Sequence, residues 1–123
     1  MASSATINMI LYGIPNCTTV KKARAWLAEH ARDADFHDFK KRGVDAGWLR
    51  DVIRQTGWQA LVNTRGTTWR NLPDAEKAAV VDEASAIALM LAQPSVIKRP
   101  VLECDGTYHL GFAEEHYRAL FGE

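Results

Sequence analysis

The stretch YGIPNCTTVKKARAWL, from Tyr12 to Leu27, predicts the end of a strand, a proline-bearing loop and the start of a helix. The run from Ile7 to Tyr12 is apolar apart from Asn8, which is typical of a buried strand. The Asn16 side chain is expected to cap the helix by accepting backbone N–H bonds. The helix should pack one face on a sheet, because apolar residues recur in it at helical spacing: Val20, Ala23, Trp26 and Leu27.

The segments on either side of this stretch predict the rest of an α/β fold. A second strand is expected from Ala34 to Phe39, and a strand, helix and strand of this length form a βαβ unit with a parallel pair. Asp105 and Gly106 separate two β-rich runs and predict a two-residue type I′ hairpin turn. A helix from Ala113 to Phe121 closes the chain. We therefore predict a small mixed β-sheet covered by helices, with a helical insertion.

The middle of the chain carries the capping signals of several helices. Asp45 is a candidate N-cap, and Gly57 is a natural helix stop. The segment NTRGTTWRN, Asn63 to Asn71, is expected to be a polar loop. Asp82 and Ser85 offer a cap within a long apolar stretch, which favours two short helices over one.

The length and the composition bound the class of protein. The 123 residues suit one domain, which we place at residues 7–123 after a disordered leader at residues 1–6. Hydrophobic residues make up 47% and charged residues 24%, as in an ordinary globular protein. Fifteen basic residues balance fifteen acidic ones, so neither a nucleic acid nor a membrane surface is expected as a partner.

The expected location of the chain is cytoplasmic. No apolar run is long enough to cross a bilayer, and the first residues lack the pattern of a secretory signal. Two cysteines do not make a disulfide framework, which agrees with a reducing compartment. The four histidines show no zinc-type spacing with a cysteine pair, so no metal site is expected.

Cys17 is the main candidate for chemistry. At the first turn of a helix, unpaired N–H groups and the macrodipole favour an anion, and a cation on the same face, such as Lys21, adds to this. Such surroundings lower the pKa of a thiol and make its thiolate a nucleophile. The alternative is that Cys17 is a small buried packing residue. No C-x-x-C pair is present, because Val20 stands at the position of the second cysteine.

Cys104 precedes the hairpin turn and has two interpretations. It could be a resolving thiol for Cys17, or a strand residue without a redox role. We favour the second, because free cysteine is often an inert packing residue.

Three separated segments resemble the arsenate reductase (ArsC) family, and within it a YffB-like branch related to the Spx regulators. They are YGIPNCTTVKKARAWL, NTRGTTWRNLP and SVIKRPVLECDGTYHLGF, and the resemblance extends over nearly the whole chain. It implies a thioredoxin-like fold with a helical insertion and a redox role for Cys17. It also implies that Arg99 lies near this cysteine and that the following Pro100 is a cis-proline.

The chain departs from the family at positions that bind an oxyanion. Two further arginines of arsenate reductases align here with Asn63 and Gly111, although Arg65 could compensate in part. Oxyanion binding relies on several charge-assisted hydrogen bonds, so the loss of two donors argues against arsenate reduction. Spx regulators use C-x-x-C as a redox switch, and Val20 removes that switch.

The leading hypothesis is a glutathione-dependent thiol reductase that works through a mixed disulfide on Cys17, with no bound cofactor. Glutathione or another small thiol is the expected partner, with glutaredoxin as a further one. Arsenate reductase and a non-enzymatic, Spx-like partner of RNA polymerase are the alternatives. Cys17 and Arg99 are the candidate catalytic residues; the candidate substrate-binding residues are Asn16, Lys21, Arg65 and Pro100.

Overall fold

The computed structural model describes residues 9–122, so the expected leader and the first two residues of the expected strand lie outside the described part. The chain forms two compact units. The sheet unit contains the residues up to Arg42 and those from Arg99 onward, and the helical unit contains Gly43–Lys98. The helical unit is the insertion that the element order predicted.

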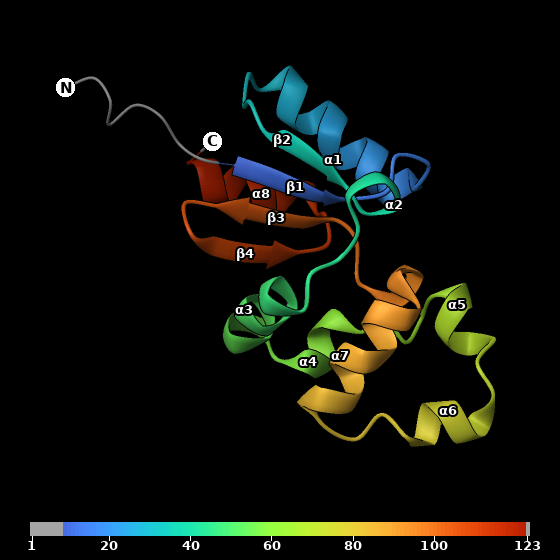
Figure 1. Ribbon diagram of the computed structural model, residues 1–123. Helices are drawn as coiled ribbons and strands as arrows, with labels where there is room; N and C mark the ends of the chain where they lie inside the picture. The colour runs from blue at the N-terminus through green and yellow to red at the C-terminus, as the bar shows by residue number, and fades with distance from the viewer. Residues whose placement is uncertain (1–8, 123) are drawn as a thin grey trace. The chain divides into compact units, whose positions relative to one another are not determined.

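The sheet unit is built on a mixed four-stranded sheet (Figure 1). Its strands are β1 (Met9–Gly13), β2 (Asp35–Asp38), β3 (Val101–Cys104) and β4 (Thr107–Leu110), in the spatial order β2-β1-β3-β4. The β1 and β2 strands run parallel, whereas β3 is antiparallel to both β1 and β4. The predicted βαβ unit with its parallel pair is therefore confirmed. The short helix α2 (Phe39–Arg42) follows β2 directly.

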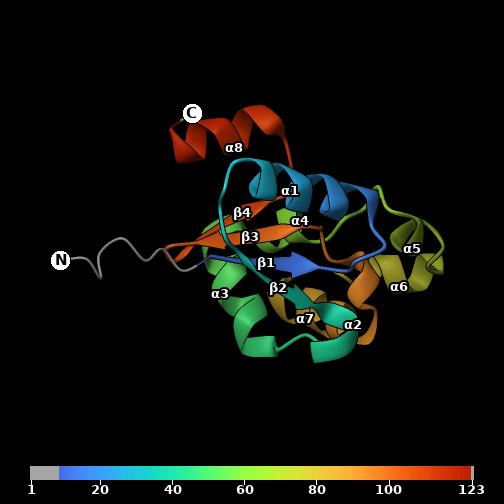
Figure 2. The same ribbon diagram turned by 90° about the horizontal axis from the view of Figure 1, so that it is seen from above.

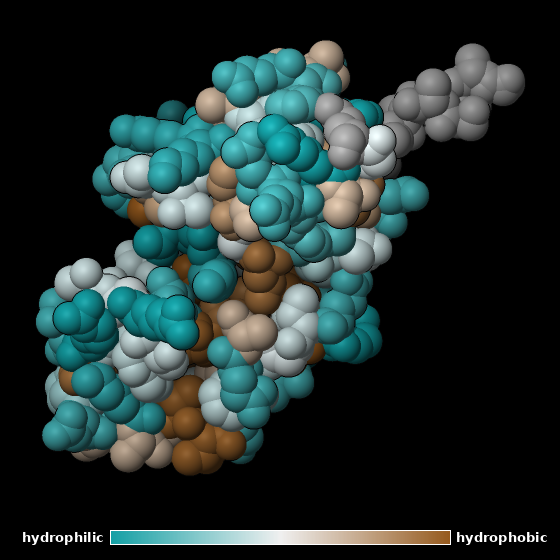
Figure 3. All heavy atoms as spheres, turned by 180° about the vertical axis from the view of Figure 1, so that it is seen from behind, coloured by the Kyte–Doolittle hydropathy of each residue, from teal (hydrophilic) through white to brown (hydrophobic). Residues whose placement is uncertain are grey.

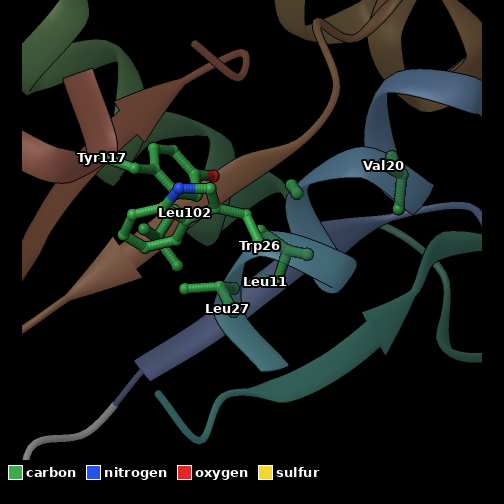
Figure 4. Close-up of a cluster of buried hydrophobic side chains, with 7 residues drawn as sticks. Leu11, Val20, Trp26, Leu27, Leu102 and Tyr117 are labelled. Atoms are coloured by element: carbon green, nitrogen blue, oxygen red, sulfur yellow. The ribbon is translucent and has the colours of Figure 1, made fainter. Parts of the chain in front are cut away.

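Two helices, α1 (Thr18–Glu29) and α8 (Glu114–Phe121), cover the same face of this sheet (Figure 2). Their apolar sides meet the inward residues of β1 and β3 in one core (Figure 4). The helical spacing in the α1 sequence predicted its buried side correctly. The buried residues of this core are Leu11, Val20, Ala23, Trp26, Leu27, Leu102 and Tyr117.

Gly13 allows α1 to lie close to the end of β1. A Cβ atom at this position would stand 2.8 Å from Cγ2 of Val20, which is fully buried and branched at its own Cβ. Only a residue without a side chain fits this distance. The close contact fixes the first turn of α1 against the strand that leads into it.

The β3–β4 hairpin has the predicted two-residue turn. Asp105 has a φ of 54° and Gly106 a φ of 84°. Positive φ at both central residues is the requirement of a type I′ turn, which Asp-Gly satisfies at low cost.

The helical unit contains five α-helices and a 3₁₀ turn within residues 43–98. The helices are α3 (Ala46–Thr56), α4 (Trp58–Leu61), α5 (Thr67–Arg70), α6 (Asp74–Ala78) and α7 (Glu83–Ala92), and the turn is η2 (Pro94–Val96). Their apolar sides form a core of their own, including Leu49, Leu61 and Met90. Val81 and Leu91 are 70% and 43% exposed. On the face shown in Figure 3, hydrophobic residues reach the surface between hydrophilic ones.

The caps of the helical unit agree with the sequence. Asp45 accepts a hydrogen bond of 3.0 Å from the Trp48 N–H, and Gly57 ends α3 with a φ of 86°. Asp82 and Ser85 form a reciprocal capping box that separates α7 from α6. The polar loop expected at residues 63–71 was partly wrong, because Thr67–Arg70 form the short helix α5.

Within the described part of the chain, no helix is long and apolar enough to cross a membrane.

Candidate functional site

Cys17 occupies the N-cap position of α1. Its backbone is extended, with φ −93° and ψ 127°, and its carbonyl accepts the first helical bond from the Lys21 N–H at 2.9 Å. Asn16 was expected at this position, and that expectation was wrong. It is an exposed residue of the turn after β1, and the helix begins at Thr18, too late for Asn16 to cap it.

The surroundings of Cys17 favour its thiolate. Partial burial by itself raises the pKa of this thiol. Hydrogen bonding from the Val20 N–H, the Arg99 side chain and the Thr19 N–H, together with the charge of Arg99, outweighs burial and leaves the pKa lowered. The side chain makes no capping hydrogen bond of standard geometry. The N–H groups at this helix end still face the sulfur, and the anion is the better acceptor.

Arg99 lies beside Cys17 in the sheet unit, although it is far from the cysteine in the sequence. The Arg99–Pro100 peptide bond is cis, as the resemblance implied. Pro100 directly precedes β3, and its carbonyl accepts a hydrogen bond of 2.8 Å from the Gly111 N–H after β4. The expected proximity of Arg99 to the cysteine is confirmed, because its guanidinium is among the groups that lower the pKa of Cys17.

The structure places the other two predicted substrate-binding residues differently. Lys21 lies on α1 with an exposed side chain, and it is not among the groups that shift the pKa of Cys17. The contribution that we expected from this lysine is therefore not observed. Arg65 is an exposed residue of the helical unit, where its N–H donates to the Asn63 Oδ1 at 3.2 Å. Its role in the site stays a prediction, as do those of Asn16 and Pro100.

Cys104 has the surroundings of an unreactive thiol. It is half-buried at the end of β3, opposite Met9 of β1 and Thr107 of β4. Burial and the nearby Asp105 carboxylate raise the pKa of this thiol, and the charge of Arg32 offsets only part of the increase. These surroundings agree with the interpretation of Cys104 as a strand residue, whose lack of a redox role stays a prediction.

The backbone N–H groups of Thr19 and Val20 are the functional groups that sequence reasoning missed. We predicted Asn16 as the N-cap, which is one residue too early. The backbone N–H groups at the helix end were therefore expected to bond the Asn16 side chain and not the Cys17 sulfur. The available signal was the run Cys17-Thr18-Thr19, in which the cysteine could itself be the residue before the helix. Across residues 9–122, no group of three or more His, Cys, Asp or Glu side chains could hold a metal ion.

Comparison with known proteins agrees with this geometry. The ArsC family model matches residues 12–120. The solved YffB protein is 53% identical, with a TM-score of 0.86 over 91% of this chain and 97% of that chain. An arsenate reductase (ArsC) related protein from Brucella melitensis is 49% identical, with a TM-score of 0.75 over 94% and 96%. The global transcriptional regulator Spx of Streptococcus pyogenes is 30% identical over 89% of this chain and 82% of its own.

The fold of these relatives confirms the predicted fold class. The mixed four-stranded sheet, the helices α1 and α8 and the helical insertion form a thioredoxin-like α/β fold. In this fold the cysteine at the start of α1 and the cis-proline before β3 belong to the same unit.

Proposed function

The chain belongs to the ArsC family, and on this premise we propose that it is a glutathione-dependent thiol reductase with Cys17 as its single nucleophile. One observation carries the proposal. Cys17 combines a lowered pKa with partial exposure at a helix N-terminus, beside the guanidinium of Arg99. A thiolate is the reactive form of cysteine in disulfide exchange, and these surroundings favour it over the neutral thiol.

The proposed reaction takes place in three exchange steps. The Cys17 thiolate attacks a sulfur of the substrate disulfide, so that a Cys17–substrate disulfide forms and the other substrate sulfur leaves as a thiolate. A glutathione thiolate then attacks the Cys17 sulfur and releases the second substrate thiolate. A second glutathione attacks the glutathionyl sulfur, which regenerates the Cys17 thiolate and yields glutathione disulfide. Two glutathione molecules are oxidised, and one substrate disulfide is reduced.

The residues around the thiol support this sequence of steps. The N–H groups of Thr19 and Val20 stabilise Cys17 both as a nucleophile and as a leaving group, since both are thiolates. Arg99 adds a charge-assisted contact at the same sulfur. The reaction needs reduced glutathione, which the cytoplasm contains, and we propose that the protein works there.

Mass spectrometry after mild incubation with oxidised glutathione tests the proposal. We expect one glutathione adduct, on Cys17, in the wild type and in Cys104→Ser, and none in Cys17→Ser. Added reduced glutathione should then remove the adduct. The proposal fails if the wild type takes no adduct, or if the adduct forms on Cys104 alone.

Arsenate reduction is the second candidate, because Arg99 beside the thiol could also hold an oxyanion. The Brucella melitensis relative is described as related to arsenate reductase. We expect arsenate to be a poor substrate, since Asn63 and Gly111 replace two of the family's arginines. An NADPH-coupled assay with glutathione and glutaredoxin measures this. Turnover at an ordinary enzymatic rate would favour arsenate reductase over the general thiol reductase.

The third alternative is a transcriptional regulator of the Spx kind. The similarity of the chain to the Streptococcus pyogenes regulator supports it. A C-x-x-C switch would need a cysteine at position 20, and Val20 is fully buried in the core of the sheet unit. This difference favours the reductase.

A further inference from the structure

A groove of about 570 Å³ runs along one side of α1 in the sheet unit. One wall is a stripe of α1 residues at helical spacing, and the other wall is the segment that joins β4 to α8 together with the first residue of α8. The residues that line the groove are Thr19, Lys22, Ala25, Trp26, Glu29, Phe112, Ala113 and Glu114.

The α1 wall of the groove begins next to the reactive thiol. On the α1 side the first residue is Thr19, whose backbone N–H acts on the sulfur of Cys17. On the other side the first residue is Phe112, which follows Gly111, the residue bonded to the Pro100 carbonyl at 2.8 Å. A molecule joined to Cys17 by a disulfide can therefore continue into the groove.

The groove is longer than glutathione needs. Glu29 lies twelve residues beyond Cys17 along α1, and at 1.5 Å per residue this corresponds to about 18 Å. An extended peptide covers this distance in about five residues at roughly 3.3 Å each. Glutathione has one residue on each side of its cysteine, so its ends reach the region of Lys22 and stop well short of Glu29.

We propose that this groove binds an extended peptide segment around the cysteine of a protein substrate; this inference rests on the proposed function and names its substrate class. The charges of the groove set the expected sequence of that peptide. Lys22 is about 7.5 Å along α1 from Cys17 and matches an acidic side chain two residues from the peptide cysteine. Glu29 matches a basic side chain five residues away.

The contacts within the sheet unit leave these two charges available. Lys22 and Glu29 are exposed, and neither makes an ion pair with another described residue. Glu114, by contrast, pairs with Arg118 at 2.9 Å. Between the two charges the exposed methyl group of Ala25 lines the groove, about 12 Å along α1, and matches an apolar side chain four residues from the peptide cysteine.

A disulfide-exchange experiment on Cys104→Ser protein tests the proposal. The matched probe is a blocked peptide with a central cysteine, glutamate two residues away on both sides, leucine four away and lysine five away, with glycine elsewhere. Its symmetry makes the direction of binding irrelevant. The control peptide exchanges the glutamates and lysines. The measured quantity is the equilibrium between peptide and glutathione as the partner bound to Cys17, determined by mass spectrometry.

We expect the matched peptide to compete with glutathione roughly three- to tenfold better than the control peptide, the range that two surface ion pairs supply. Glu29→Lys should remove most of this preference without changing the glutathione adduct itself. Glu115→Lys, the same change at an exposed position that does not line the groove, should leave the preference intact.

The two proposals fail in different ways in this experiment. If Cys17 forms a disulfide with glutathione and with both peptides equally, or if Glu29→Lys and Glu115→Lys behave alike, the groove is not a peptide site and the reductase proposal stands. If Cys17 forms no disulfide with glutathione or with either peptide, the proposed function is wrong and the peptide site is rejected with it.

Discussion

The two cysteines of the sheet unit lie in opposite electrostatic surroundings. Both are half-buried, and burial raises the pKa of each thiol. At the start of α1 the backbone N–H groups and Arg99 reverse that effect for Cys17. At the end of β3 Cys104 has no helix end to stabilise it, and Asp105 adds to the increase. Exposure does not distinguish the two thiols, so the opposite directions of their pKa values come from the donors and charges around each sulfur.

The largest expected effect separates the two cysteines directly. Cys17→Ser should abolish the fast thiol reaction, whereas Cys104→Ser should keep it, because only the Cys17 thiolate is stabilised. Iodoacetamide rates measured against pH check this. The midpoint for Cys104→Ser should lie below the value of about 8.5 for free cysteine, and that for Cys17→Ser above it. Equal midpoints in the two variants would remove the difference on which the site is built.

The next prediction compares the arginine near each cysteine, Arg99 at Cys17 and Arg32 at Cys104. Arg99→Ala should slow alkylation of Cys17 at pH 7 by about tenfold, since a hydrogen bond to a charged group contributes roughly 1.5–3 kcal/mol and about 1.4 kcal/mol corresponds to a factor of ten. Arg32→Ala is the matched control, because Arg32 lies near Cys104. It should leave the Cys17 rate unchanged. A similar loss in both variants would indicate a general effect of charge.

A third test moves the helix end away from the sulfur. Gly13→Ala should lower the free energy of unfolding by about 1–3 kcal/mol, because the new methyl group overlaps the buried Val20 side chain. It should also slow alkylation of Cys17, since the Val20 N–H is displaced. Urea unfolding and iodoacetamide rates measure the two effects. In a Val20→Ala background the same substitution should cost much less, and an undiminished cost would point to another cause.

The smallest expected effect concerns the pH dependence of stability, through a histidine pair between β4 and α8. The Nδ1 of His109 on β4 is 3.1 Å from the Nε2 of His116 on α8. Burial, and then the charge of His116, lower the pKa of His109. When the pH falls below the ordinary histidine pKa of about 6.5, His109 takes up a proton more readily in the unfolded chain than in the folded chain. The free energy of unfolding therefore decreases as the pH falls.

His109→Gln should remove this part of the pH dependence. Urea unfolding between pH 7 and pH 5 should give a shallower loss of stability for the variant than for the wild type. Alkylation of Cys17 should be the same in both proteins. Identical slopes would show that the histidine pair does not couple to folding.

The elements and their ends could largely be read from the sequence. Asp45 and Gly57 delimit α3, and the Asp105-Gly106 turn closes the hairpin, as predicted. These signals are local, because a cap or a turn depends on the backbone within a few residues. The short helix α5 and the N-cap of α1 were exceptions. Asn16 and Cys17 are adjacent candidates, and local rules favour the asparagine.

From the sequence alone came the prediction that a cysteine lies at the start of a helix in a βαβ unit, and the resemblance of three segments added that an arginine and a proline belong near it. Only the tertiary structure decided which groups act on the sulfur. Arg99 contributes and Lys21 does not, although Lys21 is far closer in the sequence. The groove and its charges likewise arise from α1 and the segment after β4. The physical reason is that helix ends depend on neighbours along the chain, whereas the pKa of a thiol and the shape of a groove depend on neighbours in space.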